Sequence, residues 1–130
     1  MQKLDAYVQQ LQQLKHVSID DYVEDDNLQA IVERRLQLSI QVCMDIAGYL
    51  IAQLGLRSPA EPENVFAVLG QEGIIPQELA KRMAGMVRFR NILVHDYLDI
   101  DSYIVHSSLT VELDDFAEFS LAIVQRVWPE

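Results

Sequence analysis

The sequence predicts an all-α protein, an up-and-down bundle of four to five helices that forms a single domain over residues 1–130. Apolar residues recur at three- and four-residue steps through most of the chain, the spacing that places them on one face of a helix. No alternation of apolar and polar residues is long enough to indicate a sheet. At 130 residues and 50% hydrophobic content, the chain is the right size to bury one sizeable core.

The first element is a helix over residues 2–16, where glutamine and lysine flank a single apolar stripe. The stripe consists of Leu4, Tyr7, Val8, Leu11 and Leu14. An acidic stretch over residues 20–27 follows, and it favours a helix start because carboxylates stabilise the exposed amides at a helix N-terminus. This stretch lacks the glycine and glutamate spacing of a calcium loop.

The next helix, over residues 27–54, is apolar on two sides. One stripe consists of Leu28, Val32, Leu36, Ile40, Cys43, Ala47, Leu50 and Leu54, and the second of Ile31, Leu38, Val42, Ile46 and Tyr49. A helix with two apolar faces has to be covered on both, and in a short bundle we expect the second cover to be another subunit. Between the stripes runs a polar line, which is either a solvent edge or the lining of a site: Glu33, Arg34, Gln37, Gln41 and Asp45.

Three further helices are expected, over residues 63–71, 77–94 and 110–127. Gly55 and Gly73 end the helices that precede them. Pro76 suits the first turn of the helix that starts at residue 77. Residues 96–101 are acidic and less regular, so the chain is expected to leave the helix there.

The charge is unevenly distributed. Twenty acidic residues face ten basic ones, and a net charge of -10 does not fit a nucleic-acid binder by bulk composition. Six of the ten cations cluster, however, and residues 79–95 contain no acid. The clustered cations are Arg34, Arg35, Lys81, Arg82, Arg88 and Arg90. Any contact with nucleic acid is therefore expected at these clusters.

The single cysteine, Cys43, lies in an apolar helical run and reads as a small core residue. With one cysteine no intrachain disulfide can form, and nothing indicates an oxidising compartment. The sequence shows neither a secretory signal pattern nor an apolar run of about eighteen residues, so we expect a cytoplasmic protein with no membrane partner.

Residues 88–97 are the strongest candidate for function. Asn91 lies four residues before His95, on the same face of a helix, where its amide can orient the imidazole ring. Arg90 lies five residues before His95, about 140° round and ~7.5 Å along an ideal helix, so only its long side chain reaches toward the ring. A guanidinium that binds a phosphate beside an imidazole that moves a proton is the minimum equipment for cleaving RNA through its own 2′-hydroxyl without a metal. The alternative is an ordinary helix C-terminus, with His95 near the last carbonyls and Arg90 on a solvated face.

The same segment carries a family pattern: Arg90 followed by a polar residue, then His95, and Tyr97 two positions later. Supporting matches lie at residues 33–37, 45–47, 73–75 and 86–91. Over roughly residues 27–105 the chain thus resembles the HepT-like branch of the HEPN superfamily. These are small all-helical ribonuclease toxins that are paired with a minimal nucleotidyltransferase (MNT) antitoxin.

The resemblance implies a homodimer in which two copies of the motif meet in a shared cleft. It implies that Arg90 and His95 are the catalytic residues of a type VII-like toxin, a metal-independent endoribonuclease with RNA, transfer RNA in particular, as substrate. It also implies that the partner nucleotidyltransferase silences the toxin by attaching AMP to Tyr97. No cofactor is expected.

Three residues are expected to support this site: Asn91 by holding the tautomer of His95, Arg34 by contacting phosphate, and Asp45 by steering a cation or the histidine. Alternatives stay open for several of these assignments. Tyr97 can be an ordinary half-buried tyrosine, and Arg34 can form an intrahelical pair with nearby acids. The whole protein can also be a non-catalytic HEPN-like helical dimer that binds a nucleotide or a partner protein, an alternative that the net charge of -10 favours.

Overall fold

The computed structural model describes the backbone of residues 2–95 and 100–127. This part of the chain is entirely helical, with six α-helices and one short 3-10 helix, which confirms the all-α prediction. The elements are α1 (Gln2–Gln12), α2 (Ile19–Glu24), α3 (Asp26–Gln53), η1 (Pro62–Asn64), α4 (Val65–Gln71), α5 (Gln77–His95) and α6 (Ser102–Val127). The additional helix is the short α2, where the sequence indicates only a helix start.

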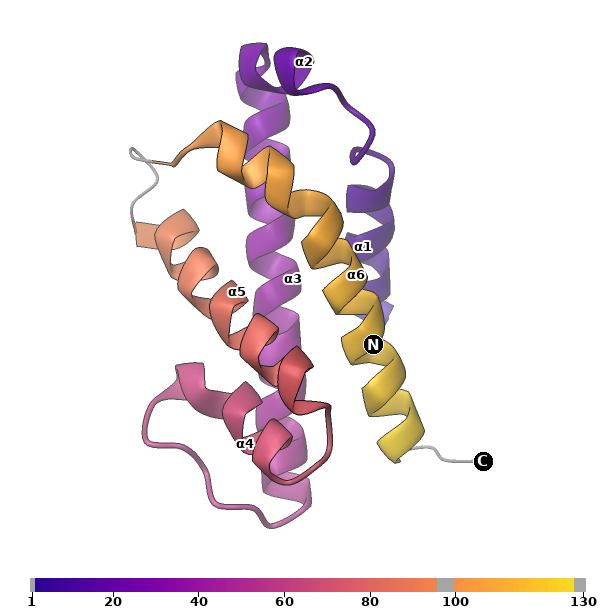
Figure 1. Cartoon of the computed structure of the whole chain (residues 1–130), viewed down its shortest axis with the longest axis vertical. Helices are drawn as coiled ribbons and strands as arrows, with labels where there is room; N and C mark the ends of the chain where they lie inside the picture. Colours follow the sequence, from indigo (N-terminus) through magenta and orange to yellow (C-terminus); the bar gives the residue numbers. More distant parts are fainter. Residues whose placement is uncertain (1, 96–99, 128–130) are drawn as a thin grey trace.

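Helix α3 is the axis of the bundle and contacts every other α-helix (Figure 1). It runs along most of the molecule, and α5 and α6 cross it side by side. Helix α1 packs against α3 and α6, while α4 packs against α3 and α5 at the end of the bundle where α3 finishes. This arrangement lays α5, which carries the Arg90 motif, against the middle of α3.

Short polar side chains determine where the helices begin. The Ser18 hydroxyl accepts a hydrogen bond from the Asp21 amide at 3.2 Å at the start of α2. The Asp25 carboxylate accepts one from the Leu28 amide at 3.0 Å at the start of α3. Each of these caps satisfies an amide that has no partner within the helix, so the acidic stretch forms a tight corner between two helices.

Two glycines end helices as the sequence predicts. Gly55 follows α3 with φ of 67°, and Gly73 follows α4 with φ of 71°. Both values lie in the left-handed region, where a side chain would be strained. The chain therefore reverses at both positions, and the second reversal leads through Ile74 and Ile75, both buried, into α5.

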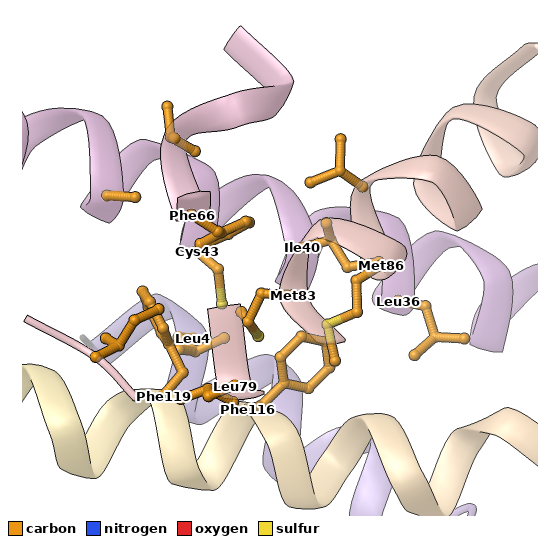
Figure 2. Packing of buried hydrophobic residues seen from close by; sticks show 14 of the residues in the cluster. Leu4, Leu36, Ile40, Cys43, Phe66, Leu79, Met83, Met86, Phe116 and Phe119 are labelled. Atoms are coloured by element: carbon orange, nitrogen blue, oxygen red, sulfur yellow. The ribbon is translucent and has the colours of Figure 1, made fainter. Parts of the chain in front are cut away.

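The core lies where α3, α5 and α6 face one another (Figure 2). Ile40 and Cys43 of α3 lie among Met83 of α5 and Phe116 of α6 in this region. Cys43 is fully buried, as predicted, and burial raises the pKa of its thiol far above the ordinary value. The thiol is therefore neutral and acts as a core side chain.

Two helix ends differ from the sequence prediction. Helix α1 ends at Gln12 rather than at residue 16, because residues 13–16 form turns. Helix α6 begins at Ser102 rather than near residue 110, because the Asp101 carboxylate accepts from the Tyr103 amide at 2.9 Å and caps it there. The added turns bury Val105 and Leu109, and these two side chains belong to the apolar face of the helix.

Among the described residues, no helix combines the length and the apolar character that crossing a bilayer requires.

Candidate active site

Arg90 lies at the contact between α5 and α3, where its half-buried side chain meets two amides. Its Nη2 donates a hydrogen bond to Oε1 of Gln41 on α3 at 2.6 Å. Its Nη1 donates to Oδ1 of Asn91 at 3.1 Å. Gln41 in turn donates from Nε2 to Oδ1 of Asp45, one turn further along α3, at 2.9 Å. These contacts form a chain, Asp45–Gln41–Arg90, that connects the two helices.

The direction of every hydrogen bond in this chain is determined by its end groups. A guanidinium can only donate, and an ionised carboxylate can only accept. The amide of Gln41 lies between the two, so its oxygen has to face Arg90 and its nitrogen has to face Asp45. Asp45 therefore determines which end of the Gln41 amide Arg90 meets.

Arg90 differs electrostatically from Arg82, which lies two turns earlier on the same helix. Arg82 donates from Nε to Asp115 at 2.9 Å and also pairs with Glu118, both on α6. Within the described part of the chain Arg90 belongs to no ion pair, since both of its acceptors are neutral amides. No carboxylate of the described residues neutralises the positive charge of Arg90, whereas Asp115 and Glu118 neutralise that of Arg82.

The Arg90 guanidinium also has unused donors. It carries five N–H bonds, and the two hydrogen bonds described above employ one on each terminal nitrogen. Its Nε is buried and has no hydrogen-bond partner among the described residues. A buried donor without a partner is costly. The second N–H of each terminal nitrogen also has no acceptor among the described residues, so these two N–H bonds can donate to a phosphate.

The other predicted site residues divide into three groups. Asn91 contacts Arg90, and Asp45 joins the chain through Gln41. Arg34 is exposed, and it makes none of the ion pairs or side-chain hydrogen bonds found among the described residues, so the alternative of an intrahelical pair with nearby acids is not seen there. His95 is the last residue of α5, but its side chain and the whole of Tyr97 lie outside the described residues. The predicted proximity of these two side chains to Arg90 therefore stays a prediction.

Gln41 is the site residue that the sequence analysis did not single out. It belongs to the polar line on the long helix, for which a solvent edge and a site lining were both open. At Gln41 and Asp45 this line meets the motif, so here it lines the candidate site. The available signal was the four-residue spacing of the two side chains on one helix face.

Among the described residues, no group of three or more His, Cys, Asp or Glu side chains is placed to hold a metal ion.

An uncovered apolar surface borders the polar line. On the second stripe of α3, Ile31 is 48% exposed and Tyr49 is 64% exposed, and the residues between them on the stripe, Leu38, Val42 and Ile46, are half-buried. At 100° per residue, Gln41 lies about 80° and Asp45 about 40° round the helix from Ile31. The stripe is thus a second apolar face of α3 beside the candidate site, as the periodicity predicts.

The chain is a HEPN-type helical domain. Its helices enclose one core in the order α1 to α6, Arg90 lies near the end of α5, and a histidine is the last residue of that helix. The model of the ribonuclease HepT-like family matches residues 4–123, and the chain belongs to that family. This confirms the resemblance seen in the sequence.

Relatives and solved structures that are similar to this chain support its membership of the family. The tRNA nuclease HepT of Aphanizomenon flos-aquae is 32% identical over 116 residues, which is 89% of this chain and 79% of the relative. The mRNA nuclease HepT of Shewanella oneidensis is 35% identical over 98 residues, 75% of this chain and 74% of the relative. A solved structure of the tri-AMPylated Shewanella oneidensis HEPN toxin in complex with MNT antitoxin matches with a TM-score of 0.85 at 30% identity, covering 93% of this chain and 90% of that one.

Proposed function

We propose that this protein is the toxin of a type VII-like HEPN/MNT toxin–antitoxin pair, a metal-independent ribonuclease that cleaves RNA through its 2′-hydroxyl. The observation that carries this proposal is the state of Arg90: a half-buried guanidinium held by neutral amides, with donors to spare. The membership of the chain in the ribonuclease HepT-like family supports it.

In the proposed mechanism, His95 takes the proton of the ribose 2′-hydroxyl or gives a proton to the leaving 5′-oxygen. An imidazole suits both directions because its ordinary pKa of about 6.5 lies near neutrality. Arg90 stabilises the negative charge that builds on the phosphorane, and Asn91 helps to hold the histidine. The 2′-oxygen bonds to phosphorus as the 5′-oxygen leaves, which gives a 2′,3′-cyclic phosphate and a 5′-hydroxyl.

We propose transfer RNA as the substrate. The two curated HepT relatives are named as nucleases of different RNAs, one of tRNA and one of mRNA, and the tRNA nuclease matches the larger share of this chain. A body with a net charge of -10 repels RNA, so binding depends on local cations. Arg34 and Arg88, both exposed, would contact phosphates that flank the scissile bond.

We propose further that the working protein is a cytoplasmic homodimer joined through the exposed stripe of α3. A second copy seated on Ile31 and Tyr49 would cover apolar area that water now contacts. Because Gln41 and Asp45 lie next to that stripe, the same contact would bring the second copy beside Arg90. Each Arg90 would then face a groove shared by two copies of the motif.

The proposed regulator is an MNT-type nucleotidyltransferase that attaches AMP to Tyr97. The matched HEPN toxin from Shewanella oneidensis is tri-AMPylated and is bound to its MNT antitoxin. Tyr97 follows His95 by two residues, so an AMP group there would put bulk and negative charge where the RNA phosphate has to bind. Incubation with ATP, magnesium and the partner enzyme, followed by peptide mass mapping, tests this step, and modification of other residues only would refute it.

The central test compares the purified wild-type protein with Arg90→Ala and His95→Ala on tRNA and mRNA, with EDTA present. We expect wild-type cleavage to persist in the chelator and to leave 2′,3′-cyclic phosphate ends, and each variant to lose at least about 100-fold in rate. Induced expression of the wild type should arrest growth, and expression of either variant should do so much less. A wild-type protein that neither cleaves RNA nor arrests growth would favour the alternative, a non-catalytic dimer that binds a nucleotide or a partner.

A further inference from the structure

We propose that Gln41 is a positioning residue for Arg90: its amide oxygen holds the guanidinium in the orientation that receives the phosphate, and Asp45 holds that amide the right way round. The inference rests on the proposed ribonuclease function and gives a role in it to a residue of α3, whereas Arg90 lies on α5. Gln41 does not contact the reacting atoms in this proposal, and it acts only through Arg90.

Two hydrogen bonds from different nitrogens determine the plane of the guanidinium. Nη2 is held by Gln41 at 2.6 Å and Nη1 by Asn91 at 3.1 Å. An arginine side chain has many rotamers, and fixing it costs conformational entropy. Because Gln41 and Asn91 are part of the folded protein, much of that ordering precedes the arrival of RNA.

The chemical type of the acceptor is as important as its position. A carboxylate at residue 41 would hold the guanidinium equally well, but it would also neutralise the charge, as Asp115 and Glu118 do for Arg82. An amide oxygen orients the group and leaves its full positive charge for the phosphate. Glutamine at position 41 therefore meets both requirements, whereas glutamate would meet only the first and leucine only the second.

Asp45 supplies the remaining constraint. A glutamine amide can turn over and exchange its oxygen for its nitrogen at little cost when both ends lack strong partners. With the Asp45 carboxylate at 2.9 Å from Nε2, the turned amide would bring an oxygen against a carboxylate and an NH₂ against a guanidinium. Replacing the carboxylate by the amide of asparagine removes this preference, because asparagine both donates and accepts.

The test measures steady-state RNA cleavage by Gln41→Leu, Gln41→Glu and Asp45→Asn. Gln41→Leu should lower kcat by about 10- to 100-fold with little change in KM, because the guanidinium loses its orientation but keeps its charge. Gln41→Glu should instead raise KM by about tenfold, because its carboxylate competes with the phosphate for Arg90. Asp45→Asn should lower kcat by less than Gln41→Leu does.

Gln37 provides the matched control. It lies one turn before Gln41 on the same polar line, is also half-buried, and makes no side-chain hydrogen bond among the described residues. Gln37→Leu and Gln37→Glu make the same changes in size and charge, and both should cleave RNA as the wild type does. Equal losses of RNA cleavage at positions 37 and 41 would mean that cleavage depends on the polar line as a whole, and would overturn the positioning role assigned to Gln41.

A second readout separates this inference from the ribonuclease proposal. Nitrogen-15 NMR of the Arg90 side chain reports rotation about the Cζ–Nη bonds without any RNA. Rotation should be slow in the wild type, faster in Gln41→Leu and Asp45→Asn, and unchanged in Gln37→Leu. If Gln41→Leu leaves both the rotation and kcat unaltered in a protein whose Arg90→Ala form is inactive, the positioning role is refuted while the ribonuclease function stands. If the wild type is inactive on RNA, the ribonuclease proposal fails, and the NMR comparison alone decides whether Gln41 orders Arg90.

Discussion

Gly70 of α4 and Ala80 of α5 approach so closely that a Cβ atom built on Gly70 would lie 2.7 Å from the Cβ of Ala80. No flexible side chain stands between the two helices at this point to absorb the overlap. The contact determines how near α4 lies to the start of α5, the helix that carries Arg90. A side chain at position 70 therefore has to push the two helices apart.

Gly70→Ala should destabilise the protein by about 1–3 kcal/mol, the usual cost of overpacking a tight core contact. Gly48→Ala is the matched control, because Gly48 lies inside α3 and a Cβ there meets nothing within 4 Å. That change should stabilise the protein by up to about 1 kcal/mol through helix propensity. Urea denaturation of the two variants measures both effects, and equal stabilities would contradict the role given to the contact with Ala80.

Arg82 should contribute to the stability of the fold, whereas Arg90 should contribute to RNA cleavage. Arg82→Gln leaves the buried Asp115 carboxylate without its cation, so we expect a clear loss of stability. Adding Asp115→Asn should recover part of that loss, because the buried charge is removed as well. The folded Arg82→Gln variant should still cleave RNA, and a selective loss of cleavage in a variant of unchanged melting temperature would contradict this division of roles.

Arg90→Lys tests whether the site needs a guanidinium or only a positive charge. Lysine keeps the charge but cannot donate to Gln41 and Asn91 from two nitrogens in one plane. We expect a loss of about 100-fold in kcat, close to that of removing a transition-state donor altogether. Arg57→Lys makes the same exchange at an exposed position in the loop after α3, outside the clustered cations, and should be near the wild type. Full activity in Arg90→Lys would show that the planar donor set is dispensable.

Glu112 on α6 should make stability depend on pH. Burial first, and the charge of Asp115 second, raise the pKa of this buried carboxyl from 4.5 to about 8, and its Oε2 has no hydrogen-bond partner among the described residues. Between these two values the unfolded chain has released the proton while the folded protein still holds it. The unfolded state thus binds fewer protons, and stability falls with rising pH by up to ~1.4 kcal/mol per unit, then levels off above pH 8.

Glu112→Gln should remove this slope. At pH 8 the variant should be more stable than the wild type, and near pH 4.5 the two should be similar, as measured by urea denaturation at a series of pH values. Glu63→Gln, at an exposed residue of η1, makes the same chemical change and should leave the slope in place. A wild-type stability that rises from pH 5 to pH 8 would contradict the assignment to Glu112.

Most of the fold follows from the sequence because local signals determine it. Apolar periodicity placed the main helices, and Gly55 and Gly73 marked two ends. Helix α6 begins earlier than expected. Ser107 and Ser108, residue types that favour caps and turns, lie inside it, and their hydroxyls donate to the Ile104 carbonyl at 3.0 and 2.7 Å.

Spacing along the chain reveals the site only where it is continuous; Asp45 of α3 was expected to support the site, but by steering a cation or the histidine rather than by holding Gln41. Arg90 and Asn91 are neighbours, so the motif revealed both. Gln41 lies 49 residues before Arg90, and only the crossing of α5 over α3 brings the two together. A polar line on a helix marks a face that a polar side chain can contact, but it does not show which side chain of another helix does so. That information belongs to the packing of the core rather than to either helix.

The stripe of α3 gives the last prediction, which concerns assembly. Tyr49→Asp and Ile31→Asp each place a charge on the exposed apolar face beside the site, where a second copy would have to bury it. We expect the wild type to be a dimer by sedimentation equilibrium and both variants to be monomers with an unchanged helical content. Because both side chains already have substantial contact with water within one copy, the fold itself should tolerate the charge.

Leu121→Asp is the matched control, since Leu121 is 59% exposed on α6 and therefore tests a new surface charge away from the α3 stripe. It should stay dimeric and active. If the shared groove is needed for catalysis, the Tyr49→Asp monomer should lose RNA cleavage although its Arg90 and Gln41 are unaltered, and raising the protein concentration should restore part of it by mass action. A monomer that cleaves RNA at the wild-type rate would mean that one Arg90 motif suffices, and the apolar stripe would then serve another partner.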